Sequence, residues 1–97
     1  MTIHDVAVAL AAQAERVCLV LLPGGKRVGQ EWLCGDCTGI EGESMSVELE
    51  GPKCGLWFDQ ASEEGGDMID LVAANKLVSK GLATKWAREF LGIKDDF

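Results

Sequence analysis

The residues with the clearest capacity for chemistry are three cysteines in the middle of the chain. Cys34 and Cys37 form a Cys-x-x-Cys pair, and sixteen residues separate Cys37 from Cys54. A thiolate pair at this spacing is typical of half a tetrahedral zinc site. Because no second pair follows, a site would need Cys54 together with Asp59 or Cys18. We therefore expect no cofactor, with zinc at the three central cysteines as the alternative.

Other chemistry finds little support in the sequence. A redox-active pair needs a helix N-terminus or a nearby cation, whereas Glu31 and Asp36 would raise the thiol pKa values. His4 is the only histidine and lies far from any serine or cysteine that it could activate. The acidic residues between 59 and 67 could hold magnesium, but only Lys53 is nearby to grip a phosphate. We predict that the chain is not an enzyme.

Charge is distributed unevenly along the 97 residues. Residues 1–30 carry two acidic and three basic side chains, residues 31–70 carry eleven and one, and residues 71–97 carry three and five. The net charge of −7 thus arises in the central segment, which would repel phosphate backbones except where bases cluster. A solvated, solubilising surface is the simplest interpretation of this acidity.

Helical packing is expected before the central segment. Thr2 and Asp5 have the spacing of a capping box. Apolar residues then recur at three- and four-residue steps as far as Leu21, which predicts one N-terminal helix that ends at Pro23-Gly24-Gly25. Cys18 in this helix is expected to be a buried small hydrophobic residue, and the lone histidine a surface residue.

Two more helices are expected after the central segment. The first should begin at Asp67, because a carboxylate is favoured at a helix N-terminus, and it should extend to Leu77. Gly81 should interrupt the chain before a last helix that ends at Gly92. We interpret the apolar stripe of this helix as core. The stripe and its flank consist of Leu82, Ala83, Trp86, Ala87, Phe90 and Leu91.

Between these helices the pattern changes to strands. Residues 30–34, 44–50 and 55–59 are each typical of a short strand, and apolar and polar side chains alternate in the second. Glycine-containing turns separate the strands, and residues 61–66 are expected to be a loop. The sequence thus predicts an α+β fold in one domain, residues 1–97. A small three-stranded antiparallel sheet would be flanked by one N-terminal and two C-terminal helices, with one face wet.

No apolar run approaches the roughly 20 residues of a membrane-spanning helix. The N-terminus also lacks the basic and apolar regions of a secretory signal. We therefore expect a cytoplasmic protein without membrane association, in which the cysteines stay reduced.

Three stretches within residues 17–75 match one type of domain in order. LLPGGKRVGQEWLCGDC leads to a ligand pair, SMSVELEGPKCGLWF supplies two strands, and EEGGDMIDL opens a helix. Together they resemble the N-terminal zinc-ribbon domain of bacterial and phage DNA primases, in the form found in prophage and plasmid primase-helicases. Cys34 falls on the family's first cysteine and Cys37 on its histidine. The helix signature is matched by Gly66, Asp67, Ile69, Asp70 and Leu71.

The chain departs from this family at the second ligand pair. Counted back from Asp67, the family's two remaining cysteines fall near Asp59 and Ser62, which are poor zinc ligands. The resemblance therefore implies a degenerate member that keeps the zinc-ribbon-like sheet without the metal and is held by apolar packing instead.

In the family, this domain helps to select single-stranded template for primer synthesis. The resemblance implies a template-facing sheet in which tryptophans stack on bases and cationic side chains contact phosphates. Without the resemblance, the same tryptophans would be core residues and the bases ordinary loop charges. The expected nucleic-acid-binding residues are Lys26, Arg27, Trp32, Lys53 and Trp57.

Two functions follow from these observations. The first is a non-catalytic primase-type module of phage or mobile-element origin, which helps a replication protein to engage single-stranded DNA or a partner domain. The second is a free-standing acidic inhibitor, of the anti-CRISPR or DNA-mimic kind, that binds a basic host nucleic-acid-binding protein. A small structural zinc protein is less favoured than either. The protein-binding surface of the second function would consist of Glu41, Glu43, Glu48, Glu50, Glu63 and Glu64.

Overall fold

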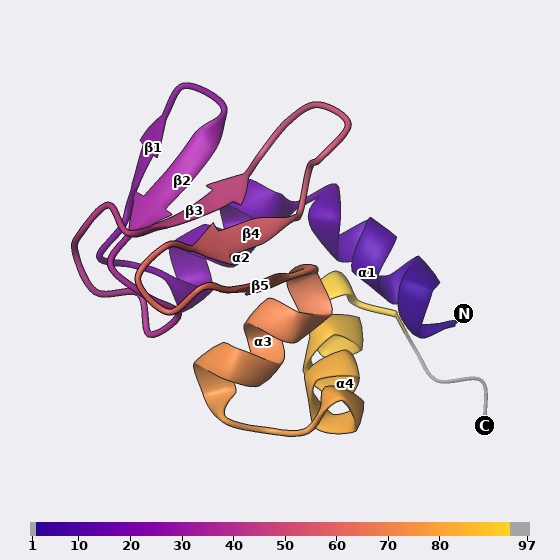
Figure 1. Cartoon of the computed structure of the whole chain (residues 1–97). Coiled ribbons are helices and arrows are strands. Elements are labelled where there is room, and N and C mark those ends of the chain that lie inside the picture. Colours follow the sequence, from indigo (N-terminus) through magenta and orange to yellow (C-terminus); the bar gives the residue numbers. More distant parts are fainter. Residues whose placement is uncertain (1, 94–97) are drawn as a thin grey trace.

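The computed structural model describes residues 2–93, which form an α+β fold with four helices and a five-stranded antiparallel sheet (Figure 1). The predicted class is confirmed, but the prediction of three strands and three helices is wrong. Residues 1 and 94–97 of the expected domain lie outside the described residues. In chain order the elements are α1 (Ile3–Ala11), α2 (Ala14–Leu21), β1 (Lys26–Val28), β2 (Glu31–Cys34), β3 (Met45–Glu48), β4 (Trp57–Asp59), β5 (Glu64–Gly66), α3 (Met68–Lys76) and α4 (Lys80–Leu91).

The N-terminal segment forms two helices where one was predicted. The capping box is present, because the Asp5 N–H donates to the Thr2 hydroxyl and the Thr2 N–H donates to the Asp5 carboxylate, both at 3.1 Å. The break falls at Gln13, whose φ of −119° and ψ of 31° lie outside the helical range. No proline or glycine marks it. The break lets α1 pack against α3 and α4 while α2 lies behind the sheet (Figure 1).

The strands lie in the order β1-β2-β3-β4-β5, and every neighbouring pair is antiparallel. The three predicted strands correspond to β2, β3 and β4. The edge strands β1 and β5 have three residues each, so pairing with a neighbour decides their conformation more than their own sequence does. The predicted loop of residues 61–66 is therefore confirmed for residues 61–63, a turn in which Glu63 has a φ of 59°, and is wrong for residues 64–66, which form β5.

The sheet has a covered face and an open face. Alternation along β3 places Met45 and Val47 in the core and Ser46 and Glu48 on the other side. The register extends this division, because side chains of paired residues lie on the same side of a sheet. The covered face carries Trp32, Cys34, Met45, Val47, Trp57 and Asp59. The open face carries Lys26, Val28, Glu31, Leu33, Ser46, Glu48, Phe58 and Gly65.

Two buried indoles connect the covered face to the helices. Trp32 Nε1 donates to the Leu22 carbonyl at 3.1 Å, and Trp57 Nε1 donates to the Asp67 carbonyl at 2.8 Å. A glycine is required at Gly25, since a Cβ there would lie 2.3 Å from Trp32 Nε1. Each indole therefore fills the core while its single donor stays satisfied.

Helix α3 begins where the sequence predicts and ends before Leu77. Asp67 is its N-cap, and it exchanges hydrogen bonds with Asp70 in a capping box, at 2.9 and 3.0 Å. Leu77 is the C-cap, in the left-handed conformation with a φ of 56°, and its side chain is 90% exposed. The prediction that Leu77 belongs to the helix is thus wrong by one residue.

Helix α4 begins earlier than the sequence predicts. Ser79 is its N-cap, and its hydroxyl accepts from the Leu82 N–H, so Gly81 lies inside the helix and does not interrupt it. Only part of the predicted core stripe is buried. Ala83 and Ala87 are fully buried because the small side chains face α1 and α3, whereas Leu82 is exposed. Trp86 and Phe90 are half-buried and stack with a centroid distance of 5.1 Å.

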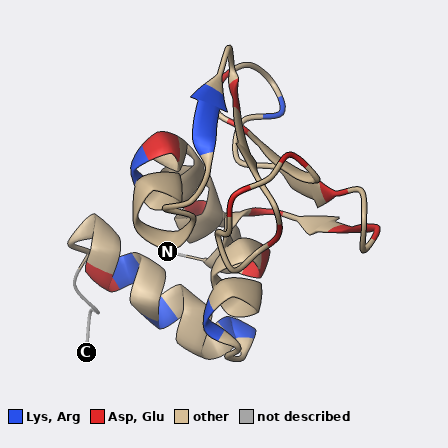
Figure 2. Ribbon diagram, turned by 90° about the vertical axis from the view of Figure 1, so that its left-hand side faces the viewer, with Lys and Arg blue, Asp and Glu red and all other residues tan. Residues whose placement is uncertain are grey.

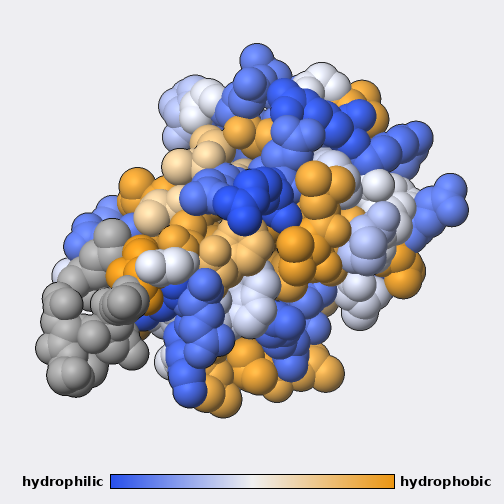
Figure 3. Space-filling view, turned by 180° about the vertical axis from the view of Figure 1, so that it is seen from behind, coloured by the Kyte–Doolittle hydropathy of each residue, from blue (hydrophilic) through white to orange (hydrophobic). Residues whose placement is uncertain are grey.

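The helical side of the molecule carries apolar and charged side chains interspersed, as Figure 3 shows from behind. Exposed apolar residues on it include Val8 of α1 and Leu19 and Val20 of α2. Within residues 2–93, no helix combines the length and the apolar character needed to cross a bilayer.

The conformation of Leu77 yields a test of the fold. A side chain with a Cβ is strained in the left-handed region, where glycine is not, so Leu77→Gly should raise the free energy of unfolding by about 1 kcal/mol. The matched control is Leu82→Gly, which places glycine inside α4 and should lower it by about 1 kcal/mol. Urea denaturation measures both values. A loss of stability in both variants would contradict the C-cap assigned to Leu77.

Candidate functional site

The conspicuous chemistry of the chain gathers at one end of the sheet. Cys34 pairs with Met45, Met45 with Asp59, and Asp59 with Glu64. The loops of residues 35–44 and 60–63 therefore leave the sheet from the same end. We call this end, with residues 34–45 and 59–64, the acidic end. All four positions that the primase resemblance assigns to metal ligands lie here: Cys34, Cys37, Asp59 and Ser62.

The two cysteines of the acidic end are set in a compact loop. The Cys34 thiol donates to the Asp36 carbonyl at 3.3 Å, and the Gly35 N–H donates to the Ile40 carbonyl at 2.7 Å. Burial, and then the carboxylates of Asp36 and Asp59, raise the pKa of the Cys34 thiol to about 11. Burial and Asp36 also raise the pKa of Cys37. Both sulfurs are therefore thiols at neutral pH, which disfavours redox chemistry.

Asp59 is a buried carboxylate that is already hydrogen-bonded. Its Oδ1 accepts from the Ser44 hydroxyl at 2.7 Å and from the Ala61 N–H at 2.9 Å. These donors, the Ser44 hydroxyl foremost, hold the pKa of the Asp59 carboxyl below its usual value of 3.8. Asp59 thus stays ionised and closes the turn between β4 and β5.

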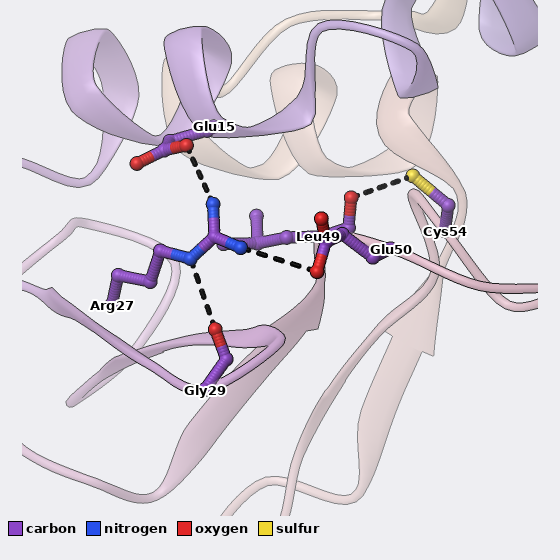
Figure 4. A network of polar contacts seen from close by, with 6 residues as sticks. All are labelled: Glu15, Arg27, Gly29, Leu49, Glu50 and Cys54. Carbon is purple, nitrogen blue, oxygen red and sulfur yellow. Dashed lines mark hydrogen bonds and ion pairs between the residues drawn. The ribbon is translucent and has the colours of Figure 1, made fainter.

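Cys54 does not join the other two cysteines of the predicted zinc site. Its thiol lies 3.1 Å from both the Ala11 and the Leu49 carbonyl, beyond the last residue of β3 (Figure 4). Cys34 pairs with the first residue of that strand, which at about 3.3 Å per residue separates the two cysteines by roughly 10 Å or more. The structure therefore does not bring Cys54 together with Cys34 and Cys37.

Cys18, the alternative fourth zinc ligand, lies in the core. It is fully buried there, as predicted, and burial raises the pKa of its thiol to about 12. Among the residues that the structure describes, no three histidine, cysteine, aspartate or glutamate side chains are grouped as metal ligands. Zinc at Cys34, Cys37 and Cys54 stays a prediction.

Neither tryptophan is placed to stack on a nucleic-acid base. Trp32 is 5% exposed and Trp57 is 6% exposed, and both indoles lie on the covered face of the sheet. Base stacking by either ring would require it to leave the core and to break its hydrogen bond. The alternative interpretation of both residues as core is confirmed.

Arg27 is engaged within the molecule. Its guanidinium lies 2.7 Å from Glu15 and 3.2 Å from Glu50, and its Nε donates to the Gly29 carbonyl at 2.9 Å (Figure 4). It therefore joins α2, the β1–β2 turn and the segment after β3. An arginine with two carboxylate partners offers little net positive charge to a phosphate.

The other two expected phosphate contacts are scattered. Lys26 lies on the open face, with its ammonium 3.8 Å from Glu43 at the acidic end. Lys53 lies in the loop between β3 and β4, at the opposite end of the sheet, and is exposed. The five expected nucleic-acid-binding residues thus do not form one surface.

The six glutamates of the alternative surface divide into three places. Glu48 lies on the open face, and Glu50 is held by Arg27 at the far end of the sheet. The other four are exposed and lie together at the acidic end. Figure 2 shows many of the acidic residues on the sheet and its loops, whereas bases are most frequent on β1 and α4. The four are Glu41, Glu43, Glu63 and Glu64.

Sequence reasoning missed two residues that shape the acidic end. Asn75 of α3 donates through Nδ2 to the Leu21 carbonyl at 2.9 Å and the Cys37 carbonyl at 2.8 Å, so it fixes the cysteine loop onto the helices. Ser44 holds Asp59. An asparagine on the otherwise apolar face of the α3 segment could have indicated a buried hydrogen bond, whereas nothing in the sequence distinguishes Ser44.

Comparison of the chain with protein-family models, with curated protein sequences and with solved structures gave no match. The residues and their geometry therefore carry the functional argument.

Asp59 yields a pH test. Because its pKa is lower in the folded state than its ordinary 3.8, its stabilising effect is fully present above about pH 4 and is lost as the pH falls through the folded-state pKa. Asp59→Asn should therefore lower the free energy of unfolding by about 1–2 kcal/mol at pH 7. At pH 3 the free energies of unfolding of the variant and the original chain should differ by less. Urea denaturation at both pH values measures it.

The control for this test is Ser44→Ala, which keeps the carboxylate and removes its hydroxyl donor. It should give a smaller loss at pH 7. An Asp59→Asn effect of equal size at pH 7 and pH 3 would show that ionisation of Asp59 does not stabilise the fold.

Proposed function

We propose that the chain is a non-catalytic protein-binding module whose acidic end contacts a basic surface of a nucleic-acid-binding protein. The observation that supports this most directly is the gathering of Glu41, Glu43, Glu63 and Glu64, all exposed, at one end of the sheet. Lys26 is the base that forms an ion pair there. The local excess of negative charge attracts a cationic protein surface and speeds encounter with it.

The arrangement of the bases supports the same proposal over direct binding of DNA. Arg27 is held by two carboxylates, and Lys26 and Lys53 lie at different places. The bases of α4 lie on the helical side of the molecule (Figure 2). A single strand would need a continuous basic groove with exposed aromatic rings, and the sheet presents carboxylates instead.

The proposal is tested by capture of partners from a nuclease-treated extract of the source organism. The charge-neutralised variant is E41Q/E43Q/E63Q/E64Q. A captured protein should carry a basic surface, and its Kd should rise at least about tenfold for this variant and also rise with salt. The matched control is E15Q/E50Q/E89Q, which removes carboxylates elsewhere and should change Kd by less than about twofold. Capture of nucleic acid without protein would overturn the proposal.

A second candidate is the primase-type module suggested by the resemblance. The observation that favours it is that Cys34, Cys37, Asp59 and Ser62 all leave the same end of the sheet, as two ligand pairs of a zinc ribbon must. The glycine and aspartates of the helix signature carry less weight, because the capping box of α3 accounts for Asp67 and Asp70 on its own. Salt-sensitive binding of single-stranded DNA, weakened by K26A/R27A, would favour this candidate.

Restoring the missing ligands tests the resemblance itself. Asp59→Cys with Ser62→Cys should create a four-cysteine site that holds one zinc ion per chain. Metal analysis and the visible absorption of a cobalt-substituted sample measure it, with the original chain analysed in parallel for zinc at its own cysteines. Adding Cys34→Ser should abolish the gain. A folded double variant that binds no zinc would show that these positions are not those of a zinc ribbon.

A further inference from the structure

The open face of the sheet carries an apolar row that no helix covers. Leu33, Ser46 and Phe58 follow one another across β2, β3 and β4, and Phe58 is 47% exposed. Alternation along β4 places Phe58 on the open face, whereas its neighbours Trp57 and Asp59 are buried on the covered face. Exposed rings of this kind are typical anchors of protein interfaces.

Both ends of this row are shaped by glycines. At one end the Phe58 ring lies against Gly65, where a Cβ would be 3.1 Å from Cδ1 of the ring and 2.6 Å from the Trp57 carbonyl. At the other end Leu33 lines a cleft of about 350 Å³, together with Gly24, Gly42 and the side chains of Lys26, Glu41 and Glu43. The row thus runs from the cleft beside Leu33 to the ring of Phe58.

Carboxylates border the row on both sides. Glu41 and Glu43 lie on the side of the acidic end, and Glu31 and Glu48 lie on the other side, directly opposite each other across β2 and β3. Like charges in such a cross-strand pair destabilise a sheet. Within residues 2–93, neither Glu31 nor Glu48 has an ion-pair partner. The Glu31–Glu48 repulsion therefore lowers the stability of the sheet, and no basic side chain of the described residues offsets it. This is expected if a basic side chain of a partner pairs with these carboxylates.

The spacing of the row fits an α-helix. Adjacent strands lie about 4.8 Å apart, so Leu33 and Phe58, two strands apart, are separated by roughly 10 Å. Residues i and i+7 of a helix are about 10.5 Å apart along its axis and share one face. The small side chain of Ser46 between them leaves room for the intervening turn. Lysine or arginine residues flanking that apolar face would lie beside the two borders of carboxylates.

We propose that this row is the seat of a basic amphipathic helix of the partner, with apolar residues i and i+7 on Leu33 and Phe58. The inference rests on the proposed function and specifies its partner. The inference adds that the contact lies on the open face, with the acidic end along one border, whereas the proposed function places it on the acidic end alone. Hydrophobic contact then supplies the affinity, and the carboxylates set the orientation and exclude anionic partners.

The test uses the full chain and a synthetic helical peptide of about 18 residues, with leucine at i and i+7, lysine at four positions that flank the leucine face and alanine elsewhere. Alanine is used because a peptide of mostly lysine would not form a helix. A permuted peptide of the same composition, with its leucines at i and i+5, is the control ligand, since it places them on different faces. Fluorescence anisotropy gives Kd, and amide shifts of the labelled protein locate the contact. We expect the peptide with leucines at i and i+7 to bind more tightly, with shifts centred on Leu33, Ser46 and Phe58.

Variants then separate this inference from the proposed function. Phe58→Ala should weaken binding of the helical peptide at least about tenfold, and Ser46→Lys should do the same by blocking the middle of the row. The matched control is Val20→Ala, an equally exposed apolar residue on α2, which should leave Kd unchanged. Thermal unfolding checks that each variant is folded.

Three results would overturn the inference. The first is a Kd unaffected by both Phe58→Ala and Ser46→Lys. The second is equal affinity for the two peptides, with shifts confined to Glu41, Glu43, Glu63 and Glu64. In the second case the proposed function survives, because the acidic end alone binds the basic ligand. Amide shifts confined to β1 would also overturn it, since they would indicate that the peptide adds as a strand at the free edge.

Discussion

The fold depends on the burial of two tryptophans, one on either side of Val47, on the covered face of the sheet. Trp32 and Trp57 both pair with Val47, from opposite sides, so the three side chains form a continuous layer between the sheet and the helices. An indole buries about 200 Å², which at 25 cal/mol per Å² corresponds to roughly 5 kcal/mol as an upper estimate. Because each N–H donates to a backbone carbonyl at a helix end, this burial also fixes where α2 stops and α3 starts.

This layer determines which surface is free to act. With both indoles committed to the covered face, the exposed ring on the open face is Phe58. Arg27 points to the covered side, as its pairing with Trp32 requires, and is neutralised by Glu15 and Glu50. Among the described residues of the strands, Lys26 is therefore the base on the open face, which also carries the carboxylates of Glu31 and Glu48, and for this reason we favour a basic protein partner over a nucleic acid.

The features that the sequence predicts well are those decided locally. The capping box of Thr2 with Asp5 and the start of α3 at Asp67 depend on residues close in sequence and need no knowledge of the rest of the chain. Alternation in β3 likewise reveals that one face is buried. The break at Gln13 and the edge strands β1 and β5 escape prediction because tertiary packing imposes them on segments without turn residues or strand propensity of their own.

The candidate site shows the same division. Sequence proximity and composition identify the acidic end and the cysteine pair, but the surroundings of Arg27 and Cys54 depend on contacts between distant segments. Arg27 contacts Glu15, 12 residues away in sequence, and also Glu50. Cys54 contacts Ala11, 43 residues away. No residue type reveals such partners in advance. A tryptophan is equally suited to a core and to a nucleic-acid surface, so only its exposure decides between the two.

If the sheet does descend from a zinc ribbon, its present contacts explain how it holds together without a complete ligand set. A zinc ion would tie the turn after β2 to the turn after β4. Here Met45 is fully buried between Cys34 and Asp59, with which it pairs on either side. Asp59 closes its own turn through Ser44 and Ala61, and Asn75 holds the cysteine loop from the helix side. Apolar packing and hydrogen bonds thus connect both turns, and this leaves the outer carboxylates free of any structural duty and able to face a partner.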